Sequence, residues 1–155
     1  MYSFTVSTDI EATPARIWRA LCDPVEVVQW DTGVVEALDA PPDYPQPGQH
    51  VRWRYSNGPF RILHDRPQEV VPERMLRAFI SIGPAWFDET YTLEPGGGSA
   101  GLTTGCGCRL SAAMRVRAPV PPLGWLLERL YLGPESRRAV IASLAAIKRH
   151  CESGA

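Results

Sequence analysis

At 155 residues and 17.1 kDa, with 45% apolar and 21% charged residues, the chain has an ordinary globular composition that excludes a disordered or fibrous protein and suits one domain over residues 1–155. The formal net charge is −1 and both signs are interspersed, which excludes the basic surface expected for a nucleic-acid partner. No apolar run approaches the roughly 18 residues that cross a bilayer, and the four cysteines lack disulfide-scaffold spacing, so we expect a cytoplasmic protein with no integral membrane association.

The first thirty residues predict a strand followed by two short helices. Alternation of polar and apolar residues over Phe4–Ile10 has the period of two that is typical of a half-buried strand. Thr13 then provides an N-cap and Pro14 a first-turn proline for the first helix. Asp23 likewise provides an N-cap for the second helix, and Glu26 three residues later suggests a capping box at its start.

The middle of the chain predicts an antiparallel meander. Strand-like runs are expected at residues 34–38, 50–55, 60–71, 74–82, 86–94 and 102 to about 114. Asn57-Gly58, Pro72-Glu73, Gly83-Pro84 and the glycines at 96–98 separate the later runs, and each is suited to a hairpin turn. Residues 40–48, with four prolines and a glycine, must be a loop.

The C-terminal part predicts an interrupted helical region. Apolar residues over 125–131 suggest a turn or two of helix, which Gly133 ends and after which Pro134 opens the last helix. Within that helix one stripe is expected to be buried, made of Val140, Ile141, Leu144, Ile147, Lys148 and Cys151. The segment Pro119–Gly133 is either a lid or a plain connection.

Several of these residues together resemble a known superfamily. The stretch Ile10–Trp18, followed by Leu21–Pro24 and Trp30, is similar to the opening of the START-like, helix-grip proteins that include polyketide cyclases and dehydratases. Val70–Leu76, Tyr91–Pro95 and the final amphipathic helix look like that family's later landmarks, and coverage is essentially the whole chain. The resemblance implies an α+β, helix-grip fold in which a curved antiparallel sheet of six to seven strands wraps around a long C-terminal helix and leaves a cavity.

Strand parity predicts which side chains face that cavity. Because alternate residues of a strand point to opposite faces, exposed Arg52 and Arg54 place their neighbours inward, and Arg61 and Arg109 are used in the same way. The expected inward set is Val51, Trp53, Tyr55, Phe60, Ile62, His64, Phe87, Glu89, Tyr91, Leu93, Thr104, Cys106, Cys108 and Leu110, with Val140, Leu144 and Ile147 closing the space from the helix. Trp30 and Trp125 either pack in the core or line an entrance.

Glu89 is the unexpected member of this set. An ionised carboxylate in apolar surroundings costs several kcal/mol unless it is paired, so an inward Glu89 needs a raised pKa or a partner. It either anchors a ligand and exchanges protons with His64 or Tyr91, or it reaches water or an arginine near a strand end. Cys106 and Cys108 could in principle bind a metal with His64, but two thiolates without a second Cys or His pair do not make a zinc site, and we predict no metal.

These features favour the binding or transport of a small hydrophobic ligand (a lipid, polyketide or aromatic compound), without catalysis. The alternative is an enzyme of the polyketide cyclase/dehydratase type with Glu89, His64 and Tyr91 as acid and base groups. A third reading is a protein-interaction module that presents the arginine-bearing face from Arg52 to Arg77 to a partner. The glycine cluster at 96–98 lacks the lysine and helix of a phosphate-binding loop, so we expect no cofactor. No oligomeric state is indicated.

Overall fold

The computed structural model describes residues 1–96, 107–118 and 123–153. Its elements follow the predicted order, with β1 (Tyr2–Ile10), α1 (Pro14–Cys22), α2 (Pro24–Trp30), β2 (Val34–Ala37), β3 (Val51–Tyr55), β4 (Ile62–Val71), β5 (Met75–Ile82), β6 (Ala85–Pro95), β7 (Cys108–Arg117), α3 (Gly124–Leu127), the π-helical turn η1 (Glu128–Leu132) and α4 (Gly133–Glu152). The start of the last predicted strand, including Thr104 and Cys106, lies outside the described residues.

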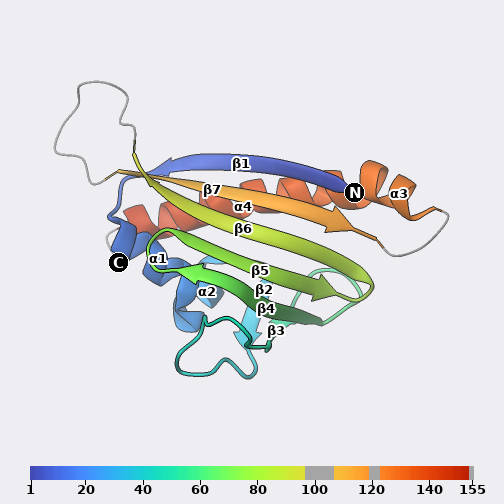
Figure 1. The fold of residues 1–155 in the computed structure, drawn as a ribbon, viewed down its shortest axis with the longest axis horizontal. Coiled ribbons are helices and arrows are strands. Elements are labelled where there is room, and N and C mark those ends of the chain that lie inside the picture. Colours follow the sequence, from blue (N-terminus) through green and yellow to red (C-terminus); the bar gives the residue numbers. More distant parts are fainter. Residues whose placement is uncertain (97–106, 119–122, 154–155) are drawn as a thin grey trace.

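The strands form one curved antiparallel sheet in the order β1-β7-β6-β5-β4-β3-β2. Consecutive strands β2 to β7 are neighbours, and β1 pairs with β7 over its whole length. α4 packs against β1 and β7. The short helices α1 and α2 lie near the C-terminal end of α4 (Figure 1). This arrangement confirms the predicted α+β helix-grip fold.

The two short helices begin where the sequence places them. The Thr13 hydroxyl accepts the Arg16 N–H at 3.1 Å, and the Asp23 carboxylate accepts the Val25 N–H at 2.9 Å, so both caps supply partners for free amides of the first turn. The capping-box prediction for Glu26 is wrong, because its carboxylate turns away from the cap and binds other side chains.

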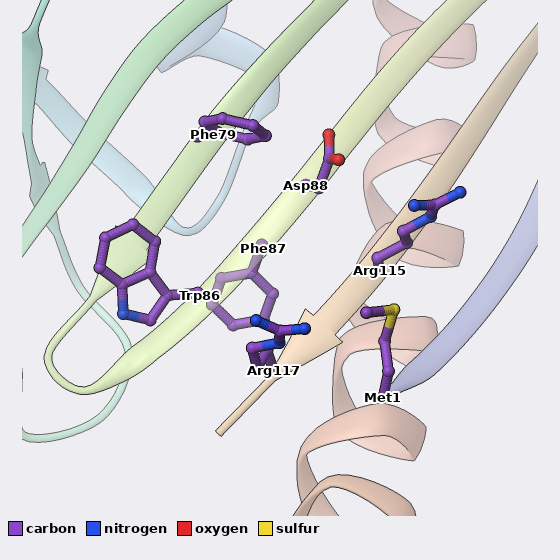
Figure 2. Close-up of a pocket in the computed structure, with 7 residues that line it drawn as sticks. All are labelled: Met1, Phe79, Trp86, Phe87, Asp88, Arg115 and Arg117. Carbon is purple, nitrogen blue, oxygen red and sulfur yellow. The ribbon is translucent and has the colours of Figure 1, made fainter. Parts of the chain in front are cut away.

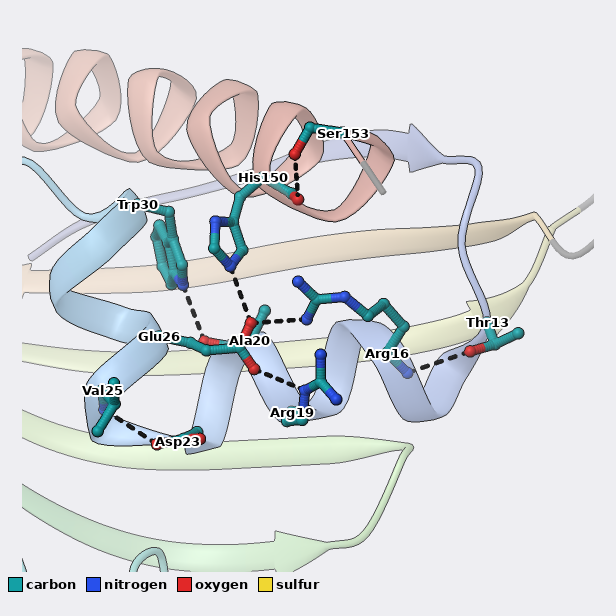
Figure 3. A network of polar contacts seen from close by, with 10 residues as sticks. All are labelled: Thr13, Arg16, Arg19, Ala20, Asp23, Val25, Glu26, Trp30, His150 and Ser153. Carbon is teal, nitrogen blue, oxygen red and sulfur yellow. Dashed lines mark hydrogen bonds and ion pairs between the residues drawn. The ribbon is translucent and has the colours of Figure 1, made fainter. Parts of the chain in front are cut away.

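Glu26 is the centre of a polar network that ties the end of α4 to α1 and α2 (Figure 3). One carboxylate oxygen meets His150 Nε2 and an Arg16 guanidinium nitrogen, each at 2.8 Å, and the other meets Arg19 Nε at 2.7 Å. Burial alone would raise the pKa of Glu26, but the hydrogen bonds from His150, Arg19 and Arg16 hold it below its ordinary value. Beside them the Trp30 indole donates to the Ala20 carbonyl at 2.8 Å.

The C-terminal helical region is continuous, which corrects the predicted interruption at Gly133. Backbone angles stay helical through Glu128, Leu132 and Gly133, and the wider turn η1 ends at Leu132, two residues before Pro134. A proline lacks the N–H of a normal α-helical turn and its ring crowds the carbonyl four residues earlier. The π-helical turn changes the local hydrogen-bond spacing, and the helix passes the proline without ending.

The core lies between α4 and the inner face of the sheet. Val140, Leu144, Ile147 and Cys151 form the buried stripe of α4, whereas Ile141 is 47% exposed, which corrects its predicted place in the stripe. They belong to one buried cluster with residues such as Ile10 and Leu110 of β1 and β7. Burial of each large aliphatic side chain stabilises the fold by roughly 1.5–3 kcal/mol. No helix in the described part of the chain is both long and apolar enough to cross a membrane.

Candidate functional site

The strand register fixes which residues share the inner face of the sheet. Directly opposed residues of an antiparallel pair point to the same side, so the pairs can be followed from β3 across to β7. The inner face carries Val51, Trp53 and Tyr55 of β3, Leu63, Asp65 and Pro67 of β4, Leu76, Ala78, Ile80 and Ile82 of β5, Ala85, Phe87, Glu89, Tyr91 and Leu93 of β6, and Cys108, Leu110, Ala112, Met114 and Val116 of β7. The parity predicted for the described residues of β3, β6 and β7 agrees with this register.

The parity predicted for β4 is inverted. His64 lies opposite exposed Arg52, and Ile62 lies opposite exposed Arg54, so both belong to the outer face rather than the cavity. The prediction counted from Arg61, which precedes the strand, and alternation does not hold across the irregular segment before Ile62. Phe60 also precedes the strand and is 45% exposed.

His64 is paired on the outer face instead. Its Nδ1 lies 2.9 Å from His50 Nε2, and burial, followed by the charges of His50 and Arg66, lowers its pKa. The sheet therefore separates His64 from Glu89 and from Cys108, and neither the acid/base pair nor the metal set that included His64 is assembled. In the described residues no group of three His, Cys, Asp or Glu side chains could hold a metal ion.

The centre of the inner face is not completely covered. Seven inward side chains of β3 to β6 keep some solvent-accessible surface, namely Tyr55, Leu63, Ile80, Ile82, Phe87, Glu89 and Tyr91. Strand β6 is third of seven and Glu89 lies near its middle, so this exposure does not come from the edge of the sheet. α4 packs chiefly against β1 and β7 and has at most weak contact with β5 and β6.

Glu89 and Tyr91 lie side by side on this face of β6. Burial raises the pKa of Glu89 to about 7, the nearby charges of Asp31 and Asp65 add to the rise, and a hydrogen bond from the Tyr91 hydroxyl opposes it. Burial also raises the pKa of Tyr91 well above its ordinary value, so the phenol stays protonated and acts as a donor. Glu89 can therefore either accept or donate a proton near neutral pH.

Asp65 of β4 is a second inward carboxyl group and is only 5% exposed. Its Oδ2 accepts the Tyr44 hydroxyl at 2.6 Å and the Trp53 indole N–H at 3.2 Å, while its Oδ1 has no hydrogen-bond partner. Burial raises the pKa of Asp65 despite these two donors. The same surroundings raise the pKa of the Cys22 thiol to about 12, first through burial and then through the charge of Asp65.

Asp31, at the end of α2, completes the group. Its carboxylate accepts the Gly33 N–H at 2.9 Å, and burial raises its pKa in spite of that bond. We call Asp31, Asp65 and Glu89 the carboxyl cluster, since the charges of the first two both act on Glu89. Sequence reasoning found Glu89 and missed the other two; the only available signal for Asp65 was its alternation with Leu63 and Pro67.

The remaining predicted site residues fall into three groups. Val51, Trp53, Cys108, Leu110, Val140, Leu144 and Ile147 are buried on the inner side, as is Trp30 between the short helices. Tyr55 and Phe87 are half-buried beside the inner space. Trp125 is 63% exposed on α3, so it does not pack in the core.

The outer face carries its own grooves. One of about 520 Å³ runs over β5 to β7 and is lined by the outer-face residues Phe79, Trp86, Asp88, Arg115 and Arg117, together with Met1 and the inner-face residue Phe87 (Figure 2). On the same face Arg77 pairs with Asp88, while Arg52 and Arg54 pair with Asp39 and Glu36. The arginine-bearing face is thus locally balanced by acids.

The whole chain matches one protein-family model. The family is described as polyketide cyclase / dehydrase and lipid transport, and the match covers residues 1–152. None of the curated proteins matches this sequence significantly.

Solved structures share the fold at low sequence identity. A protein from Mesorhizobium loti is 15% identical with a TM-score of 0.72, covering 99% of this chain and 98% of its own. A norcoclaurine synthase mutant from Thalictrum, in complex with a transition-state analogue, is 16% identical with a TM-score of 0.65, covering 97% of this chain and 94% of its own. DynU16, a protein of the dynemicin biosynthetic locus, is 20% identical with a TM-score of 0.62, covering 94% of this chain and 46% of its own.

Proposed function

Because this chain belongs to the polyketide cyclase / dehydrase and lipid transport family of START-like proteins, we propose that residues 1–155 form one domain that binds a small, largely hydrophobic molecule in its inner space. The observation that carries the proposal is the set of aromatic and aliphatic side chains, including Tyr55, Ile80 and Phe87, that stay partly accessible on the inner side of a seven-stranded sheet. Concave, mostly apolar surfaces with a few polar groups are typical of small-molecule sites.

A binding experiment tests this proposal directly. The neutral fluorophore N-phenyl-1-naphthylamine should bind saturably with enhanced fluorescence, and extraction of freshly purified protein followed by mass spectrometry should reveal a bound small molecule. Ala78 is buried beside Glu89 on the inner face, so Ala78→Leu should weaken probe binding at least tenfold by filling the space.

The matched control is Ala113→Leu, on the outer face of β7. This variant should bind the probe within about twofold of wild type. Absence of saturable binding and of extracted material from the wild-type protein would contradict the proposal.

An enzyme of the cyclase or dehydratase type is the second candidate. It is favoured by one observation, the Glu89–Tyr91 pair, in which a carboxyl group with a pKa of about 7 lies beside a neutral phenol in a desolvated site. In such a reaction Glu89 would move a proton beside a substrate carbonyl and Tyr91 would donate a hydrogen bond. Glu89→Gln should then remove turnover of a cyclising poly-β-keto substrate and leave binding of the neutral probe unchanged; an equally active variant would exclude this role.

A further inference from the structure

We propose that the molecule bound in the inner space carries a basic nitrogen, protonated at neutral pH, which it places among Asp31, Asp65 and Glu89. This inference rests on the proposed function, because it names the chemical class of ligand for the same inner space. It concerns the ligand's charge, whereas the proposed function concerns only its apolar body.

The carboxyl cluster gathers negative charge from three separate elements. Asp31 ends α2, Asp65 lies on β4 and Glu89 on β6, and the last two face the same side of the sheet. They are near enough that the charges of Asp31 and Asp65 both act on Glu89. Ionised carboxyl groups in a desolvated space repel one another. A positive charge placed among the three would therefore be favoured.

Among the described residues, the strands that form this face supply no matching cation. The inner faces of β3 to β7 carry no lysine, arginine or histidine among the described residues. None of the charged groups that act on Glu89 or Asp31 is basic, and the one that acts on Asp65 is His50, which is exposed and bound to His64 on the outer face. No basic residue occurs in the sequence of the segments that the structure does not describe, which are 97–106, 119–122 and 154–155.

A second, independent observation points to a missing donor. Asp65 is 5% exposed, faces the inner side and has one oxygen, Oδ1, without a hydrogen-bond partner. Buried carboxylate oxygens are normally satisfied, because leaving one unpaired in a desolvated site is unfavourable. Because Oδ2 already has two donors, a ligand N–H group is the natural partner for Oδ1.

The chemistry of the site selects an amine over a metal ion. No group of three suitable side chains in the described residues could hold a metal, so the three carboxyl groups do not converge as metal ligands. An ammonium group can hydrogen-bond to one carboxylate, here at Asp65 Oδ1, while the other carboxyl groups favour it through their charge at longer range. The aromatic rings of Tyr55, Phe87 and Tyr91 on the same face suit both a cation and the apolar body attached to it.

Three probes that share one ring system and differ in charge test the proposal. They are 2-(1-naphthyl)ethylamine, 2-(1-naphthyl)ethanol and 1-naphthylacetic acid, titrated at pH 7.5 and followed by fluorescence. We expect the amine to bind at least tenfold more tightly than the alcohol, and the acid to bind most weakly. Asp65→Asn and Glu89→Gln should each reduce the preference for the amine over the alcohol severalfold, with the affinity for the alcohol nearly unchanged.

Glu94→Gln is the matched control, because Glu94 lies on the same strand but on the outer face. It should leave all three dissociation constants unchanged. Equal binding of amine and alcohol by wild-type protein, or tightest binding of the acid, would overturn the inference while leaving the proposed function intact. If none of the three probes binds while N-phenyl-1-naphthylamine binds saturably, the inference alone fails; if that fluorophore does not bind either, the proposed function fails as well. The order of the three probe affinities of the wild-type protein tests the inference even where a variant folds poorly.

Discussion

Glu89 is a single residue whose protonation should be measurable in the stability of the protein. Its ordinary pKa of 4.5 rises to about 7 in the fold, mainly through burial, so between these values the unfolded chain is ionised while the folded chain keeps its proton. Stability is therefore unaffected below pH 4.5, falls as the pH rises to 7, and is constant above it. The shift from 4.5 to about 7 corresponds to no more than roughly 3.5 kcal/mol.

We predict that Glu89→Gln is more stable than wild type above pH 7 and that the difference disappears near pH 4.5. Urea unfolding at both pH values measures the effect, with Glu94→Gln as a control that should follow wild type at each pH. A Glu89→Gln protein that loses stability at pH 8 would show that the carboxylate is satisfied in the folded state.

At this scale the sequence predicted part of the site. Glu89 and Tyr91 were placed inward correctly, because β6 is regular and Leu93 anchors its parity. His64 was placed on the wrong face because its parity was counted across an irregular segment. Asp31 and Asp65 could not be found from local patterns, since their importance depends on proximity to Glu89, which is distant in sequence.

Among the elements, the junction of α4 with α1 and α2 depends on Glu26. Its side chain is only 12% exposed and meets Arg16, Arg19 and His150. Glu26→Gln should lower the free energy of unfolding at pH 7 by about 1–3 kcal/mol, because the mostly buried Arg16 guanidinium loses its charged partner. Since the folded pKa of Glu26 is lowered, the wild-type advantage is present above pH 4.5 and is lost as the pH falls through the folded value.

Chemical denaturation at pH 7 and pH 3 measures this difference. Glu135→Gln, in an exposed pair with Arg138 on the same helix, should change stability by less than about 0.5 kcal/mol and is the control. Equal stability of Glu26→Gln and wild type at pH 7 would mean that the network does not hold the junction.

Element boundaries were predicted well where local rules decide them. Thr13 and Asp23 cap the helices as expected because a cap needs only its own first turn. The continuous helix through Pro134 was not predicted. A π-helical turn accommodates the proline, and such a turn has no clear sequence pattern. The role of Glu26 was missed because its partner His150 lies more than a hundred residues away.

For the molecule as a whole, the order of elements and the resemblance were enough to predict the helix-grip fold. The prediction succeeded because alternation, caps and the amphipathic final helix agree with one topology. The carboxyl cluster could not be predicted from the sequence, because it is created by the packing of α2, β4 and β6 in three dimensions.

The raised pKa of Glu89 also makes folding a proton-uptake reaction. Near pH 6 native Glu89 holds a proton that it gives up in the denatured chain, so its contribution to thermal denaturation is the release of acid into the surrounding buffer. Scanning calorimetry should therefore report a smaller apparent enthalpy in imidazole, whose protonation is strongly exothermic, than in phosphate. Replacing Glu89 with Gln should reduce the difference in apparent enthalpy between the two buffers. An identical apparent enthalpy of the wild-type protein in both buffers would show that no net proton is exchanged.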